Sequence, residues 1–214
     1  MPPLLAGKIV FISGGSQGLG AAIARAAVRE GAQAVVVTGR RREAGEKLVA
    51  ELAEQGATAR FVQADVGDVA SAQSAVQAAV DEFGRVDCLV NSAGLTSRGT
   101  LLDTTPELFD SHVAVNLRGP YFTMQAAVRD MVRRKAPGTV VNVISIAELG
   151  GQPYLSPYVA AKAGLAGATR HAVRAAVGDL ARRDRRAPGN DGVGGRQERG
   201  RGGGQPRAAA GIGR

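Results

Sequence analysis

The stretch that most constrains the fold of this chain is a glycine-rich turn that follows an apolar strand and opens a helix. Residues 8–13 (KIVFIS) are typical of a buried strand, and residues 13–20 read Ser-Gly-Gly-Ser-Gln-Gly-Leu-Gly. Gly14 permits a tight turn, Gly18 lets the backbone approach a pyrophosphate, and Gly20 lets the helix pack closely on the sheet. Free N–H groups at the start of the helix then face the phosphates. A glycine-rich turn without a ligand is the alternative.

The alternation of strand and helix continues as far as residue 178. β-branched runs predict strands at 34–38, 60–64, 87–91 and 139–144, and apolar periodicity predicts helices at 18–30, 42–54, 69–83, 106–131 and 158–177. The helical stretch 106–131 is expected to break near Gly119-Pro120. Apolar strands that alternate with helices indicate a parallel sheet covered on both faces. We therefore expect an α/β fold, a Rossmann-like doubly wound parallel sheet in a single domain over residues 1–178.

Further motifs follow the predicted strands or lie on the helices between them. In chain order they are Asp65-Val66, Asn91-Ser92-Ala93-Gly94, Asn116, Ser145 and Tyr158-x-x-x-Lys162. Together with the spacing Gly-x-x-x-Gly-x-Gly of the turn, they resemble the motifs of the short-chain dehydrogenase/reductase family over residues 7–177. Ser92 departs from that family's second Asn.

The chemistry of the last motifs fits that resemblance. Tyr158 and Lys162 lie four residues apart and so share one helix face. An ammonium beside a phenol favours the phenolate, which makes Tyr158 a usable general acid/base. The Ser145 hydroxyl can hold and polarise a carbonyl. By the resemblance, Asn116 anchors a water that links Lys162 to solvent. An ordinary amphipathic helix face is the alternative for Tyr158 and Lys162.

The predicted cofactor site combines the glycine turn with residues at the other strand ends, and the resemblance assigns the adenine ring to the Asp65-Val66 pair. The expected cofactor residues are Gly14, Ser16, Gln17, Gly18, Leu19, Gly20, Arg40, Asp65, Val66, Asn91, Ala93, Gly94, Tyr158 and Lys162. Where NAD-preferring relatives carry an acidic residue at the end of the second strand, this chain has Gly39, followed by three arginines. Arg40 can pair bidentately with a 2′-phosphate. We therefore predict NADP rather than NAD, with a solvated basic helix start as the alternative.

The composition changes after Gly178. Residues 179–214 contain nine Arg and ten Gly but no aromatic residue, so we expect a disordered Arg/Gly-rich tail. The family continues with a sixth strand, a Pro-Gly segment and a seventh strand, and this pattern is not legible here: residues 187–189 contain Pro-Gly, but no β-branched strand precedes them. We therefore expect the sheet to be incomplete at its C-terminal strands, and a frameshift is our hypothesis for the change.

These features predict an oxidoreductase that transfers a hydride between NADP(H) and a carbonyl or secondary-alcohol substrate. Because the sixth and seventh strands are not found, a catalytically impaired, nucleotide-binding remnant is the alternative. The formal net charge of +8 raises the question of a nucleic-acid partner. The RGG-like residues 199–204 lack the interleaved aromatics that stack on bases, so we do not expect that partner. The resemblance implies a homo-oligomer formed through the Tyr158 helix.

Other residues receive no functional assignment. Cys88 is the only cysteine, so an internal disulfide cannot form, and we expect it in the core rather than as a nucleophile. His112 and His171 are expected on the surface or on helices, without metal-ligand spacing, so we predict no metal. Glu148 is expected to be a solvated loop carboxylate rather than a substrate contact. With no leader and no membrane-length apolar run, we expect a cytoplasmic protein without a membrane partner.

Overall fold

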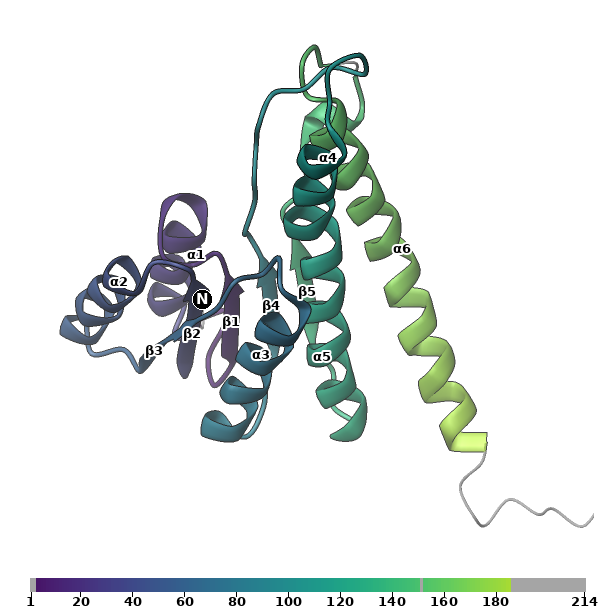
Figure 1. The fold of residues 1–214 in the computed structure, drawn as a ribbon. Helices are drawn as coiled ribbons and strands as arrows, with labels where there is room; N and C mark the ends of the chain where they lie inside the picture. Colours follow the sequence, from purple (N-terminus) through teal and green to yellow (C-terminus); the bar gives the residue numbers. More distant parts are fainter. Residues whose placement is uncertain (1–2, 151, 186–214) are drawn as a thin grey trace, which may run out of the picture.

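The computed structural model describes residues 3–150 and 152–185. In that part the chain forms one parallel sheet of five strands in the order β3-β2-β1-β4-β5, with helices on both faces (Figure 1). The strands are β1 (Ile9–Ser13), β2 (Ala34–Gly39), β3 (Ala59–Gln63), β4 (Cys88–Asn91) and β5 (Thr139–Asn142). The order reverses between β1 and β4, which makes this the Rossmann-like doubly wound sheet that the sequence predicts.

The helices divide between the two faces of the sheet. They are α1 (Gly18–Arg29), α2 (Arg42–Glu54), α3 (Val69–Phe83), α4 (Pro106–Val113), α5 (Gly119–Arg133) and α6 (Ser156–Arg185), with a π-helical stretch η1 (Ala114–Arg118) and a 3-10 turn η2 (Ile146–Glu148). Side chains of β1 point alternately to the two faces. Ile12 packs in a cluster with α1 and α2, and Phe11 packs in a second cluster with α3, α5 and α6. Each of these fully buried side chains contributes about 1.5–3 kcal/mol.

The strand register aligns the carboxyl ends of the central strands at one edge. Ser13 at the end of β1 is paired with Thr38 on one side and with Asn91 on the other, and Asn91 is paired with Asn142. In an open parallel sheet, ligands bind at this edge where the strand order reverses. The turn after β1 and the loop after β4 therefore lie side by side at the switch point.

Two helices differ from the sequence prediction. The expected break at Gly119-Pro120 is wrong, because α4 continues through η1 into α5 without an interruption. Gly119 instead allows the helix backbone to approach Val66 closely, because a Cβ at this position would collide with the carbonyl oxygen of Val66. Pro120 is the second residue of α5, directly after the π-helical stretch η1, so its missing N–H falls where the regular hydrogen-bond pattern of the helix is already altered. The last helix continues beyond the expected residue 177 to Arg185, so the first part of the expected tail is helical. Residues 186–214 lie outside the described residues.

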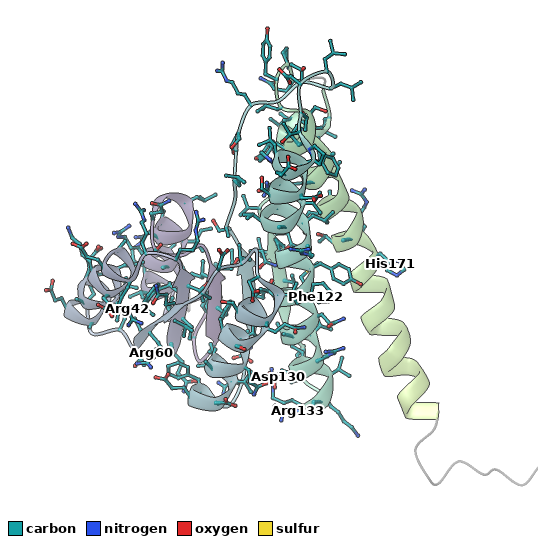
Figure 2. The ribbon with its side chains drawn as sticks, in the orientation of Figure 1. Arg42, Arg60, Phe122, Asp130, Arg133 and His171 are labelled. Atoms are coloured by element: carbon teal, nitrogen blue, oxygen red, sulfur yellow. The ribbon has the colours of Figure 1, made fainter. Side chains whose placement is uncertain are left out.

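A cluster of ion pairs joins the opposite edge of the sheet to the end of α5. The Asp130 carboxylate accepts hydrogen bonds from Arg133 at 2.7 Å, from Arg134 at 2.8 Å and from the backbone N–H of Val86 at 3.2 Å. Asp130 and Arg133 are visible at this end of the helix in Figure 2. Asp87, which precedes β4, accepts from the N–H of Ile9 at 2.9 Å. These contacts tie β1, β4 and α5 together far from the switch point.

Within the part of the chain that the structure covers, no helix is both long and apolar enough to cross a membrane.

Candidate functional site

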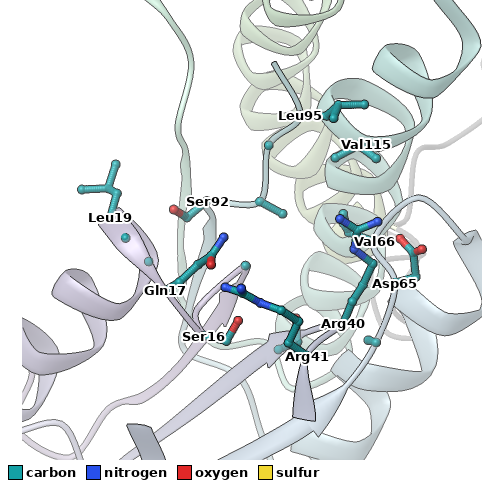
Figure 3. Close-up of a pocket in the computed structure, with 18 residues that line it drawn as sticks. Ser16, Gln17, Leu19, Arg40, Arg41, Asp65, Val66, Ser92, Leu95 and Val115 are labelled. Carbon is teal, nitrogen blue, oxygen red and sulfur yellow. The ribbon is translucent and has the colours of Figure 1, made fainter. Parts of the chain in front are cut away.

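A cavity of about 510 Å³ opens at the switch point of the sheet. It collects residues from the turn after β1, from the ends of β2 and β3 and from the loop after β4 (Figure 3). Most of the predicted cofactor residues line it, namely Gly14, Ser16, Gln17, Gly18, Leu19, Gly20, Arg40, Asp65, Val66, Ala93 and Gly94. The sequence prediction missed Thr38, Gly39, Arg41, Ala64, Ser92, Leu95 and Val115, which line the cavity as well.

The glycine turn is defined by positive φ angles and by close contacts between backbone atoms. Gly14 has φ +69°, and a Cβ there would lie 2.5 Å from the Cα of Ala93. A Cβ on Gly20 would collide with the carbonyl oxygen of Gly14, so α1 lies against the turn. Gly18 has φ +52° and open space around its Cβ position. Gln17, the N-cap of α1, makes no side-chain capping bond among the described residues, which leaves first-turn N–H groups available to an anion.

Two arginines bring positive charge into the cavity. Arg40 and Arg41 follow β2, both line the cavity, and neither forms an ion pair within the described residues. Figure 3 shows the Arg41 side chain extending toward Gln17 and the Arg40 side chain rising beside Val66. Arg42 does not line the cavity and instead bonds Glu46 and Gln63 at 3.1 and 3.0 Å. The arrangement can hold a phosphate beside the end of β2.

Asp65 lies two residues after the end of β3 and is held in a tight local turn. One oxygen of its carboxylate accepts from the N–H of Gly67 at 2.9 Å, and its own N–H donates to the Ser71 hydroxyl at 3.1 Å. Such a turn fixes the side chain at the cavity wall without using all of its acceptor capacity. Val66 supplies an apolar surface next to it, and the pair could therefore bind the edge and face of an aromatic base.

Asn91 does not line the cavity, although the resemblance places it in the cofactor site. It is 1% exposed. Its side-chain oxygen accepts from the hydroxyls of Ser13 at 3.2 Å and Thr123 at 2.7 Å, and its amide donates to Asn142 at 2.8 Å and to the Pro120 carbonyl at 3.2 Å. Asn91 therefore joins β1, β4 and β5 to α5 just beneath the cavity.

Asn116 lies in the π-helical stretch and holds the loop after β4. The residue is fully buried, its Oδ1 accepts from the N–H of Leu95 at 3.0 Å, and its Nδ2 donates to the carbonyl of the same residue at 2.8 Å. Both polar atoms of the side chain thus bind one residue of the cavity wall. Short π-helical stretches are frequent at functional sites, and the hydrogen bonds to Leu95 give this one a local role.

The remaining predicted catalytic residues gather at the carboxyl end of β5. Ser145 caps η2, with its hydroxyl accepting from the N–H of Ala147 at 3.2 Å. Lys162 is 3% exposed, and its ammonium donates to the Val143 carbonyl at 2.7 Å while lying 5.9 Å from the centre of the Tyr158 ring. Burial lowers the pKa of Lys162. None of the three residues lines the 510 Å³ cavity, and α6, which carries Tyr158 and Lys162, packs against the Asn116 segment η1.

Four residues that received no functional assignment from the sequence also have defined positions in the structure. Cys88 is half-buried on β4 against the α1–α2 cluster, and burial raises the pKa of its thiol, which disfavours a nucleophilic role. Glu148 is half-buried rather than solvated. His171 is exposed on α6 (Figure 2), whereas His112 is fully buried, which the sequence prediction did not anticipate.

Comparison with known proteins gives consistent matches. A family model described as short chain dehydrogenase matches residues 8–178. L-rhamnose 1-dehydrogenase (NAD(P)(+)) of Azotobacter vinelandii is 41% identical over 165 residues, which are 76% of this chain and 64% of that protein. The short-chain dehydrogenase/reductase FrzI of a Cladobotryum species is 38% identical over 79% of this chain and 64% of its own length. This chain therefore spans about 64% of the length of these curated relatives. A crystal structure of a short chain dehydrogenase from Mycobacterium smegmatis superposes with a TM-score of 0.79 and 32% identity over 82% of this chain and 73% of that one.

Proposed function

Because this chain belongs to the short-chain dehydrogenase family, we propose that it transfers a hydride between NADP(H) and a small carbonyl or secondary-alcohol substrate. The observation that supports the proposal is that two groups of residues lie at the same edge of the sheet. The glycine turn and two arginines that form no ion pair within the described residues fit a phosphorylated dinucleotide. Next to them, at the end of β5, Ser145, Tyr158 and Lys162 fit a reacting carbonyl.

The proposed chemistry divides between the cofactor and the protein. When bound, the nicotinamide supplies or accepts the hydride at the substrate carbon. The Ser145 hydroxyl holds the substrate oxygen, and Tyr158 gives that oxygen its proton in the reduction direction and takes it back in the oxidation direction. The Lys162 ammonium stabilises the phenolate that remains after the transfer. A water held near Asn116 would return the proton from solvent through Lys162.

We propose that the NADP preference comes from Arg40 and Arg41 together. Both guanidinium groups line the cavity where β2 ends, and Gly39 provides no carboxylate to repel a 2′-phosphate. Each charge-assisted hydrogen bond to a phosphate is worth about 1.5–3 kcal/mol, which is roughly tenfold or more in Kd. Arg41 thus joins the predicted cofactor residues.

The binding test uses three single variants and two cofactors. Arg40→Ala and Arg41→Ala are each expected to raise the Kd of NADPH by roughly tenfold or more, while the Kd of NADH changes little. Arg42→Ala removes the same charge one residue along, outside the cavity, and is the matched control. Fluorescence quenching by NADPH and NADH measures all four proteins. Equal losses in the three variants would show a general charge effect and refute the assignment.

The activity test measures NADPH oxidation with a panel of aldehydes, ketones and diketones. The unmodified chain is expected to turn over at least one of them, and Tyr158→Phe is expected to abolish turnover while NADPH still binds. Binding without turnover across the panel in the unmodified chain would instead support the nucleotide-binding alternative. Oligomerisation through the Tyr158 helix stays a prediction, for which light scattering is the measurement.

A further inference from the structure

His112 is a fully buried histidine that the proposed chemistry does not use. It lies on α4, four residues before Asn116, with none of its surface exposed. A buried imidazole needs partners for both ring nitrogens, or it loses hydrogen bonds that water would have supplied. The partners of His112 are therefore informative about what the residue does.

Both ring nitrogens have backbone partners, and these determine the tautomer. Nε2 lies 3.1 Å from the backbone nitrogen of Ser97, and Nδ1 lies 2.9 Å from the carbonyl oxygen of Leu108. The Ser97 N–H can only donate, so Nε2 accepts. The Leu108 carbonyl can only accept, so Nδ1 carries the proton and donates. His112 must be neutral, with its proton on Nδ1, for both bonds to exist.

His112 and Asn116 together form two adjacent attachments to one loop. His112 in α4 and Asn116 in η1 are four residues apart, about one helical turn, and Leu95 and Ser97 are two residues apart in the loop after β4. Asn116 binds the backbone of Leu95 while His112 binds that of Ser97. The helix thus holds alternate residues of the loop.

The loop that these two residues hold connects the cavity to the Tyr158 helix. Leu95 lines the cavity. Two residues after Ser97, the N–H of Gly99 donates to the Tyr154 carbonyl at 2.9 Å, and the Gly99 carbonyl accepts from the N–H of Ser156, the first residue of α6. A displacement of the loop at Ser97 would therefore move the cavity wall and weaken the contact with the start of α6.

We infer that His112 is a positioning residue, whose neutral Nδ1–H imidazole fixes the loop 95–97 at the wall of the cavity. The effect on cofactor affinity depends on the proposed function, because it assumes that a dinucleotide occupies the cavity. The tautomer and the order of the loop do not depend on it. A histidine that only fills space in the core would show no preference for this tautomer and would tolerate a leucine.

The first measurement uses the unmodified chain and needs no cofactor. Imidazole nitrogen chemical shifts of His112 are expected to show a protonated Nδ1 and an unprotonated, hydrogen-bonded Nε2 at neutral pH. The Ser97 amide is expected to be protected from hydrogen exchange. A protonated Nε2 in the folded protein, or an unprotected Ser97 amide, overturns the inference.

The second measurement compares three variants. His112→Leu fills the site with an apolar side chain that has no hydrogen-bonding nitrogen, and its Ser97 amide is expected to lose protection by roughly tenfold, as expected for one lost hydrogen bond. His112→Gln offers a carbonyl oxygen as acceptor and is expected to restore most of the protection. Ser111→Ala is the matched control, because Ser111 donates to the same Leu108 carbonyl at 2.7 Å but makes no side-chain hydrogen bond to the loop within the described residues. Its Ser97 protection is expected to stay at the level of the unmodified chain.

The affinity for NADPH is measured separately from the tautomer of His112 and the exchange of the Ser97 amide. The NADPH Kd is expected to rise several-fold in His112→Leu and to return toward that of the unmodified chain in His112→Gln. Equal values for the leucine and glutamine variants, in Ser97 exchange and in NADPH affinity, contradict the inference. If the unmodified chain binds no dinucleotide, the proposed function fails, while the tautomer and the Ser97 exchange still decide the role of His112.

Discussion

Asp130 gives a prediction whose size can be worked from the structure. Its carboxylate is 5% exposed and accepts from Arg134, which is 19% exposed, and from Arg133, which is 68% exposed. Burial by itself would raise the pKa of Asp130, but the hydrogen bonds from Arg133, Arg134 and the Val86 N–H outweigh it and hold the pKa below its ordinary value. The charged form of Asp130 is therefore favoured in the folded chain.

Asp130→Asn removes this charge while leaving an oxygen that can accept from the Val86 N–H. The bond to Arg134 is charge-assisted and sheltered, and such bonds contribute about 1.5–3 kcal/mol. The exposed pair with Arg133 adds about 0–0.5 kcal/mol. Arg134 keeps a bond to the Val86 carbonyl at 3.0 Å and lies 3.8 Å from Asp87, so the loss stays below the 3–5 kcal/mol of a fully isolated buried charge. We expect a destabilisation of about 2–3 kcal/mol at pH 7, or roughly 5–10 °C in Tm.

Urea unfolding of the unmodified chain, Asp130→Asn and Arg133→Ala at pH 7 measures these differences. Arg133→Ala is the control and is expected to change the free energy of unfolding by less than about 0.5 kcal/mol. Because the pKa of Asp130 is lowered in the folded state, its stabilisation is complete above the ordinary carboxyl pKa of about 3.9 and is lost as the pH falls through the folded-state value. The difference between the unmodified chain and Asp130→Asn should therefore shrink in acid. A change below about 0.5 kcal/mol for Asp130→Asn at pH 7, or equal effects of the two variants, would refute this reasoning.

Two further substitutions test the turn and the buried lysine. Gly14→Ala places a Cβ at a residue with positive φ and 2.5 Å from the backbone of Ala93. Gly84→Ala, where φ is +78° but the space is open, is expected to lower the free energy of unfolding by roughly 1 kcal/mol. Calorimetry should show a much larger loss for Gly14→Ala, and NADPH binding should disappear. Similar losses in stability for the two variants would mean that the close approach to Ala93 does not matter. Lys162→Met removes an ammonium whose pKa is lowered by burial, so Tm should stay equal or rise while turnover is lost. A clear fall in Tm would contradict the view that this charge is kept at the expense of stability.

Much of the fold and part of the site could be predicted from local patterns. The strand β1, the glycine turn and α1 follow one another within residues 9–29, and the tight turn and the close approach of helix to strand require glycines there. The spacing of Tyr158 and Lys162 likewise puts both on one face of α6, where the ammonium lies near the phenol ring. These are relations between near neighbours in the chain, which the sequence itself encodes.

The direction of neighbouring side chains could not be predicted in the same way. Arg40, Arg41 and Arg42 are chemically identical, yet two line the cavity and the third does not. Arg42 is the first residue of α2, where Glu46 one turn later and Gln63 at the end of β3 bind it. The glutamine comes from a strand twenty-one residues away, and its position depends on the pairing of β2 with β3.

The sequence by itself determined the alternation of strands and helices, the glycine-rich turn after β1 and the placement of Tyr158 and Lys162 on one face of α6. Each depends on residue type and on spacing within a few turns of chain. Only the tertiary structure decided that Asn91 joins strands beneath the cavity and that His112 is buried against Ser97. Buried polar groups form hydrogen bonds with whichever backbone or side-chain atoms the packing brings close to them. The identity of these partners therefore cannot be predicted from the local sequence.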